Sequence, residues 1–188
     1  MVLEIVEVGD PVLRQPARQL TRAELRSPSI VQLVELMRET MRAAPGVGLA
    51  APQIGQSIAL AVIEDRAEYH TALTPEELAR RGRIPVAFHI VANPRLEVVD
   101  ATPALHAEGC LSVPGLAAEV PRATAVRVHA LDHAGEPITI EARGWYAQIL
   151  QHELDHLVGT LYVDRMHSRT LTTLRHHAAR RPAATVPR

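Results

Sequence analysis

The stretch that organises this chain runs from Trp145 to Gly159, WYAQILQHELDHLVG, and contains the pattern His-Glu-x-x-His. Residues four apart lie on one face of a helix, so His152 and His156 can both reach one metal ion. Glu153 is rotated by about a quarter turn from His152, and its carboxylate can contact a water on that ion without being a ligand. Two imidazoles that hold an ion and a carboxylate that handles a proton are the parts of a metal hydrolase.

The same short pattern also occurs by chance on exposed helices, so its surroundings matter. Gly144 and Gly159 mark the expected start and end of the helix. Between them lies a broad apolar surface, which indicates that much of the helix is buried: Ile149, Leu150, Leu154, Leu157 and Val158. Buried histidines beside a buried glutamate are costly unless they are paired or bound to metal.

The composition is that of one globular domain with a substantial core. The chain has 188 residues, of which 47% are hydrophobic and 22% charged, and its net charge is −1. This charge implies no attraction of the whole protein to DNA. The single cysteine excludes an intrachain disulfide and fits a reducing compartment. No secretory leader and no apolar run of roughly 20 residues is seen, so we expect a cytoplasmic protein without a membrane partner, organellar only if a transit peptide has been removed.

Periodicity predicts a mainly antiparallel α+β fold. Residues 1–27 read as irregular, Ser27-Pro28 starts a helix that continues to Arg42, and Thr74-Pro75-Glu76-Glu77 is a capping box for a short helix to Arg81. Alternating or apolar runs predict the strands 58–63, 86–91, 96–99, 124–131 and 137–142, of which the last two form a hairpin around Gly135. Strands joined by local turns, with few helices, indicate this fold class.

Residues 44–55, APGVGLAAPQIG, are small and nearly all apolar. They could form a turn into the next strand, which composition favours, or a loop whose backbone approaches a ligand, where Cβ atoms are unwelcome. Gly46-x-Gly48 does not match a dinucleotide loop, because a third glycine is missing and a helix precedes it.

A catalytic metal site needs a third protein ligand. Asp164 and His167 are candidates by position. The other candidate is Cys110, because Gly109 before it and Pro114-Gly115 after it indicate an irregular, tightly placed backbone. A thiol beside a dication has a strongly lowered pKa and would bind as the thiolate.

Three stretches together resemble the motifs of the peptide deformylase family, in order and roughly in spacing: GVGLAAPQ at 46–53, EGCLS at 108–112 and QHELDH at 151–156. The resemblance covers about residues 5–170, and Gly144-Trp145 with residues 164–170 resemble the branch that includes organellar enzymes. It implies antiparallel β-sheets packed around a central helix that carries His-Glu-x-x-His, in one catalytic domain, 1–170. Residues 171–188 are then a basic, flexible tail, for which a solvated end and a contact with RNA are the two interpretations.

The resemblance also implies the metal site and its chemistry. Cys110, His152 and His156 are the implied ligands of one divalent ion. Fe²⁺ is the usual physiological metal of the family and Zn²⁺, Ni²⁺ or Co²⁺ can replace it, whereas the residue types alone indicate zinc. Glu153 is the implied carrier of protons, and the side-chain amide of Gln53 and the backbone N–H of Leu111 the implied donors to the substrate's oxygen.

The implied reaction removes the formyl group from the N-terminal methionine of newly made polypeptides and releases formate, with a transient ribosome contact as a further expectation. Gly46, Val47, Gly48 and Gly109 are expected to pair with substrate backbone. Gln148 and Ile149 would line the methionine pocket, and Trp145 would either narrow its mouth or anchor the core. A zinc endopeptidase and a catalytically inactive relative that acts as a binding protein are the alternatives.

Glu108 and Arg122 have two interpretations. They could form an ion pair that holds the segment around Cys110, or they could be a solvated pair of little consequence.

Overall fold

A computed structural model describes residues 1–71 and 73–179 of the chain. Within these residues one antiparallel sheet has the strand order β1-β2-β3-β4-β5, and β6 pairs with β4 on the edge opposite to β3. Its strands are β1 (Gly48–Ala50), β2 (Leu60–Asp65), β3 (Val86–Cys110), β4 (Val113–Leu131), β5 (Pro137–Arg143) and β6 (Thr172–Thr173). The α+β class and the antiparallel pairing predicted from the sequence are confirmed.

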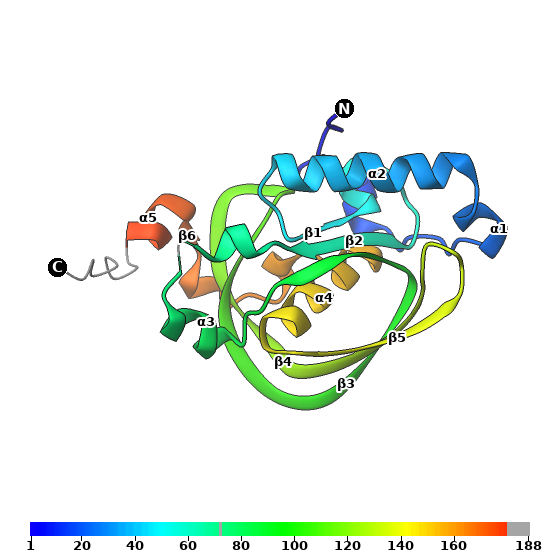
Figure 1. The fold of residues 1–188 in the computed structure, drawn as a ribbon. Helices are drawn as coiled ribbons and strands as arrows, with labels where there is room; N and C mark the ends of the chain where they lie inside the picture. The colour runs from blue at the N-terminus through cyan, green and yellow to red at the C-terminus, as the bar shows by residue number, and fades with distance from the viewer. Residues whose placement is uncertain (72, 180–188) are drawn as a thin grey trace.

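β3 corrects one prediction. The sequence indicated two strands, 86–91 and 96–99, separated by Asn93-Pro94, but the structure has a single strand of 25 residues. Its register with β4 shifts between Ala92 and Arg95. Pro94 has no N–H for the ladder and Asn93 has a positive φ of 48°, so the strand is interrupted there without ending. β3 and β4 together make the long curved hairpin seen in Figure 1.

The predicted hairpin over residues 124–142 is confirmed as β4–β5, with Leu131 opposite Pro137. Asp132 Oδ1 accepts hydrogen bonds from the backbone N–H groups of Ala134 and Glu136, and Gly135 has φ +74°. An aspartate that caps its own turn, followed by a glycine, is the turn chemistry that the sequence indicated.

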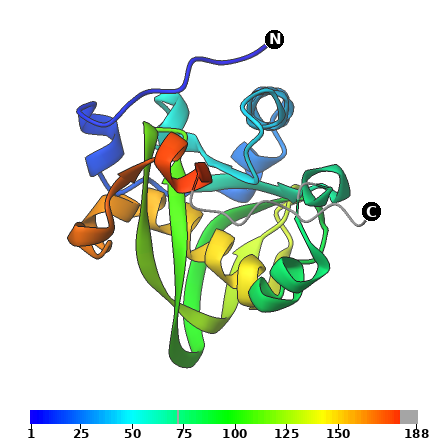
Figure 2. The same cartoon turned by 90° about the vertical axis from the view of Figure 1, so that its left-hand side faces the viewer.

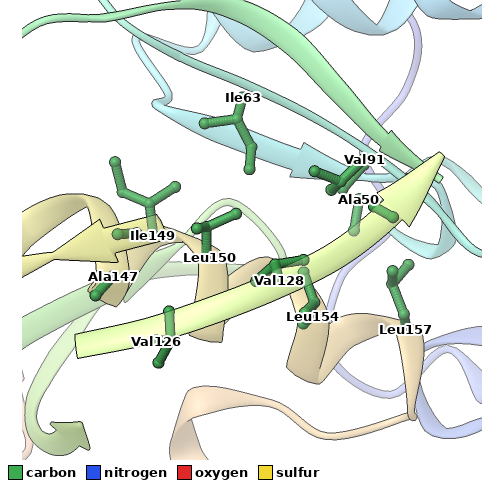
Figure 3. Close-up of a cluster of buried hydrophobic side chains, with 13 residues drawn as sticks. Ala50, Ile63, Val91, Val126, Val128, Ala147, Ile149, Leu150, Leu154 and Leu157 are labelled. Atoms are coloured by element: carbon green, nitrogen blue, oxygen red, sulfur yellow. The ribbon is translucent and has the colours of Figure 1, made fainter. Parts of the chain in front are cut away.

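α4 (Gly144–Leu157) lies in the concave face of the sheet and contacts β1 to β5 (Figure 1). Its apolar face packs against both ends of the sheet, as Figure 3 shows for Leu150 between Ile63 and Val128. Each such side chain stabilises the fold by about 1.5–3 kcal/mol when fully buried. The helix ends where predicted: Gly159 has φ +76°, and a Cβ there would lie 2.6 Å from the carbonyl carbon of Arg14.

The predicted helix from Pro28 is α2 (Pro28–Ala43), and the Ser27 side chain accepts a hydrogen bond from its first turn. It covers the face of β1 and β2 that is turned away from α4 (Figure 1). β2 is therefore buried on both faces. Ala61 and Ile63 belong to the core beneath α4, while Leu60 and Val62 pack with α2, as expected for side chains that alternate along a strand.

The remaining elements are short. The predicted capping box at Thr74 is confirmed, and α3 (Pro75–Arg81) follows it. The N-terminal 27 residues contain two helical turns, η1 (Pro11–Arg14) and α1 (Arg22–Leu25), where the sequence indicated irregular backbone. The other short elements are the 3₁₀ turns η2 (Ala51–Ile54), η3 (Ala67–His70), η4 (Tyr162–Asp164) and η5 (Ser168–Thr170). No helix of the described residues is long and apolar enough to cross a membrane.

Part of the predicted C-terminal tail, residues 171–188, has regular structure. β6 pairs with β4 and continues into α5 (Leu174–Ala179), and the flexibility of the tail stays a prediction. Residues 180–188 lie outside the described residues. The division of the chain at residue 170 stays a prediction.

Candidate active site

Three donor atoms converge at one point of the fold. Cys110 ends β3, and His152 and His156 lie one turn apart on α4; their ligand atoms are all within 4.8 Å of one another. The Sγ of Cys110 is 3.4 Å from Nε2 of His156. Burial lowers the pKa of His156, which favours the neutral imidazole that metals bind. One thiol and two imidazoles fit a transition-metal ion, and the set leaves room for a water or substrate atom.

The other candidates for a third ligand are not part of this cluster of donors. Asp164 is engaged elsewhere, because it pairs with Arg14 and accepts a hydrogen bond from the backbone N–H of Leu161 at 2.8 Å. The structure therefore favours Cys110.

Glu108 contacts His152, lines the cavity described below and is 5% exposed. It accepts hydrogen bonds from Nδ1 of His152 at 2.9 Å, from Gln148 at 3.1 Å and from Arg122 at 2.8 and 2.9 Å. Burial alone would raise the pKa of Glu108, but the hydrogen bonds from Arg122 and His152 outweigh it and lower the pKa to about 2. Of the two interpretations of Glu108 and Arg122, the buried ion pair is the one observed, and through Glu108 it orients His152, a candidate metal ligand.

The network continues to the surface through two residues to which the sequence reasoning gave no role. Asp155 accepts hydrogen bonds from Arg122 at 2.6 Å and from both Nε and Nη2 of Arg165 at 2.7 and 2.8 Å. A signal for Asp155 existed: a carboxylate on a helix expected to be buried needs a partner. Nothing local to Arg165 identified it as that partner.

Glu153 presents a carboxyl group without a partner. It is 4% exposed, and its Oε2 has no hydrogen-bond partner among the described residues. Burial raises its pKa to about 7. The backbone of Gly48 lies against it, and a Cβ at Gly48 would be 2.2 Å from Oε1. A buried carboxyl whose Oε2 has no hydrogen-bond partner among the described residues, beside three metal donors, can accept and return a proton.

The glycine-rich segment forms a strand and a turn, and it also lines the cavity described below. It forms β1 and then η2, and this turn brings Gln53 into the site. Oε1 of Gln53 accepts a hydrogen bond from the N–H of Ala50 at 2.8 Å, which directs Nε2 toward Sγ of Cys110, 3.5 Å away, and Oγ of Ser112, 3.3 Å away. Leu111 follows Cys110 in the turn between β3 and β4.

A cavity of about 340 Å³ opens over these groups. Gln53, Cys110, Leu111, His152 and Glu153 line it, and so do all seven residues predicted to bind substrate: Gly46, Val47, Gly48, Gly109, Trp145, Gln148 and Ile149. Arg83 and Leu174 also line it and were not predicted. Both come from segments whose position relative to α4 depends on the folded chain.

Trp145 contacts both the core and the cavity, so both of its interpretations stay open. It is half-buried, packs on the core beneath α4 and lines the cavity. The guanidinium carbons of Arg83 and Arg81 lie 4.6 and 5.4 Å from its ring centroid. Arg83 is held in turn by two hydrogen bonds of 2.8 Å to the buried Asp65. These contacts with Trp145 hold the segment that contains α3 next to the cavity.

Together these features define a metal-hydrolase type of site, in which the His-Glu-x-x-His helix is joined by a thiol from a neighbouring hairpin. Residues 2–171 match the family model described as polypeptide deformylase, and the chain belongs to this family. Its members are enzymes.

Relatives occur in bacteria and in organelles. The chain is 46% identical over 171 residues to "Peptide deformylase 1A, chloroplastic" of Solanum lycopersicum, which covers 91% of this chain and 62% of the relative. It is 48% identical to "Peptide deformylase 3" of Streptomyces avermitilis, over 91% of this chain and 74% of that one, and 39% identical to the human mitochondrial deformylase, over 90% and 70%. The chain thus spans less than two thirds of the tomato protein.

Solved structures share the fold. A class I type b peptide deformylase from Acinetobacter baumannii, with Met-Ala-Ser bound, superposes with a TM-score of 0.79 at 32% identity and covers 88% of this chain and 99% of that one. An actinonin complex of the Synechococcus elongatus enzyme has a TM-score of 0.73 at 36% identity, over 89% and 80%.

Proposed function

We propose that this protein removes the formyl group from the N-terminal methionine of newly made polypeptides. The observation that carries the proposal is the juxtaposition of an unpartnered buried carboxyl, Glu153, with the donors of Cys110, His152 and His156 inside one cavity. The substrates would be nascent chains, met transiently at the ribosome. The cytoplasm of a bacterial-type cell is the proposed location, since deformylases of Streptomyces are among the relatives.

Cys110, His152 and His156 would hold one divalent ion. We propose Fe²⁺ as the physiological metal, with Zn²⁺, Ni²⁺ or Co²⁺ as substitutes. When bound, such an ion supplies Lewis acidity, which lowers the pKa of water toward neutrality. Glu108 keeps the ring of His152 oriented from behind.

Groups of the protein then transfer the proton and stabilise the developing negative charge. Glu153 takes the proton of the attacking water and delivers it to the nitrogen as the bond from nitrogen to the formyl carbon breaks, leaving formate and a free amine. Negative charge grows on the formyl oxygen during the attack. Nε2 of Gln53 and the backbone N–H of Leu111 are the proposed donors to it, and loss of one such donor typically lowers the rate by about 10²–10³.

The peptide would bind in extended form between two strands. Gly46, Val47, Gly48 and Gly109 all line the cavity, so a peptide could add backbone hydrogen bonds to these segments. Its methionine side chain would enter between Gln148 and Ile149, with Trp145 at the mouth. The Acinetobacter protein has Met-Ala-Ser bound, a peptide that begins with methionine.

The test is formate release from formyl-Met-Ala-Ser by protein loaded with Fe²⁺ without air. We expect release that a chelator abolishes and that Glu153→Ala lowers by about 10²–10⁴ without loss of bound metal. Full activity of Glu153→Ala would refute its role.

Absence of release from metal-loaded wild type would refute the proposed function. Cleavage within longer unformylated peptides would then identify the endopeptidase alternative. Peptide binding without any cleavage would identify the inactive relative.

A further inference from the structure

We infer that Leu174 is a specificity-determining residue: it binds an apolar side chain of the peptide at the second or third residue, after formyl-methionine. The inference rests on the proposed function and adds a contact from outside the matched family segment, since that match ends at residue 171.

The pairing of β6 places this residue. Thr172 and Thr173 lie opposite Ala117 and Leu116 of β4, on the edge of β4 that β3 leaves free. The chain then turns into α5, which contacts β4 near the end of the β3–β4 hairpin (Figure 2). Cys110 belongs to this hairpin, so residues of the tail that pack against the hairpin lie next to the cavity.

Leu174 lies on the cavity wall beside Gly109. It lines the cavity and is 47% exposed. A Cβ at Gly109 would be 3.7 Å from Cδ2 of Leu174. A side chain at Gly109 would contact Leu174, and its absence leaves about half of the Leu174 surface, 47%, uncovered by the described residues.

The course of an extended peptide brings it to Leu174. Its formyl group would lie between Glu153 and Cys110, and its methionine side chain near Ile149 on α4. An extended chain advances about 3.3 Å per residue. A peptide that pairs with the backbone at Gly109 therefore carries its second and third residues along the wall that Leu174 forms.

The effect on recognition is a preference among downstream residues. Covering a half-exposed leucine with an apolar side chain removes apolar surface from water, whereas a serine at the same position gains little. Contacts of this size typically change kcat/KM by about tenfold. If Leu174 only packs against the hairpin, its truncation will change kcat/KM by the same factor for all peptides.

The experiment compares wild type with Leu174→Ala, Leu174→Met and the control Leu171→Ala. Leu171 is similarly exposed, at 44%, and precedes β6 without lining the cavity. Each protein is assayed for formate release with formyl-Met-Leu-Ser, formyl-Met-Ser-Ser, formyl-Met-Ala-Leu and formyl-Met-Ala-Ser. Binding of the unformylated peptides is followed by the fluorescence of Trp145, the single tryptophan of the chain, which lies in the cavity.

We expect wild type to prefer leucine over serine at one of the two positions. Leu174→Ala is expected to lose about tenfold of that preference, mainly through KM and peptide affinity, Leu174→Met to restore it, and Leu171→Ala to match wild type. An unchanged preference in Leu174→Ala, or an equal loss on every peptide, would overturn the inference. Failure of the proposed function is distinguishable, because wild type would then release no formate. The fluorescence titration would still test Leu174 in that case, and the absence of a leucine preference in it would also overturn the inference.

Discussion

Nδ1 of His152 donates a hydrogen bond to the buried carboxylate of Glu108, 2.9 Å away. When Nδ1 carries the proton, Nε2 of the same ring is free to bind a metal. Glu108 is itself fixed by Arg122 through two hydrogen bonds. The orientation of a candidate ligand on α4 is thus set by a residue of β3.

Glu108→Gln should weaken metal binding. The amide keeps the shape of the side chain but removes the charge that favours a protonated Nδ1, and changes of this kind typically cost about 10–100-fold in metal affinity. Affinity is measured by competition with a coloured chelator. Glu97→Gln, on the exposed part of β3, is the control and should bind metal as wild type does. Equal affinities in the two variants would contradict an orienting role for Glu108.

Gly48→Ala should lower turnover without removing the metal. The new Cβ would overlap Oε1 of Glu153, at 2.2 Å, and also its Cγ, at 2.7 Å. The carboxyl must therefore leave its place, and we expect the rate of formate release to fall by about 10² or more.

Combining Gly48→Ala with Glu153→Ala checks this explanation. If the glycine acts through the carboxyl, the double variant will be no slower than Glu153→Ala alone. A further large loss in the double variant would show that Gly48 acts on the substrate instead.

Arg122→Met should be among the most destabilising single changes. It leaves two buried carboxylates, Glu108 and Asp155, without their shared cation. Removal of one partner from a buried ion pair typically costs about 3–5 kcal/mol. Urea unfolding measures the loss. Arg127→Met is the matched control, because its partners Glu97 and Glu141 are exposed and such pairs contribute about 1 kcal/mol or less. Similar losses of unfolding free energy in both variants would contradict the prediction that the buried ion pairs contribute more than the exposed ones.

The pair Arg42–Glu64 should make stability depend on pH. Arg42 at the end of α2 donates two hydrogen bonds of 2.7 Å to Glu64 of β2, and they lower the pKa of Glu64 below its ordinary value of 4.5. A carboxyl with a depressed pKa in the folded state stabilises it above the unfolded pKa and loses this contribution as the pH falls. Because Arg42 is about one third exposed, we expect Arg42→Met to cost about 1 kcal/mol at pH 7.

The pH series is the check on Arg42. Urea unfolding of wild type and Arg42→Met should differ fully at pH 7 and converge progressively below about pH 4.5. A difference that stays constant down to pH 3 would mean that Arg42 stabilises the fold by packing and not by charge.

Local periodicity was enough to predict several elements. The α4 helix, its two glycine ends, the capping box at Thr74 and the β4–β5 hairpin all depend on residues close together in the chain. The same holds for the shared face of His152 and His156. Predictions were wrong where local signals were misleading. Asn93-Pro94 resembles a strand boundary, yet β3 pairs with β4 both before and after these two residues and so continues past them.

Other parts of the site depend on contacts between distant residues. Arg165 reaches Asp155, Arg83 reaches Trp145 and Leu174 reaches the cavity only because the folded chain brings their segments together. No spacing along the chain encodes these contacts, since each partner lies on a different element.

Local residue order was enough to predict that two histidines and a glutamate share one buried helix, because helical periodicity and the apolar pattern around it follow from neighbouring residues. It left Cys110, Asp164 and His167 open as the third ligand when only residue types and spacing were considered. The folded chain favours Cys110, because the β3–β4 hairpin curves around α4 and ends beside His156, while Asp164 pairs with Arg14. Helical spacing is a property of a few successive residues, whereas the meeting of a hairpin end with a helix exists only in the folded chain.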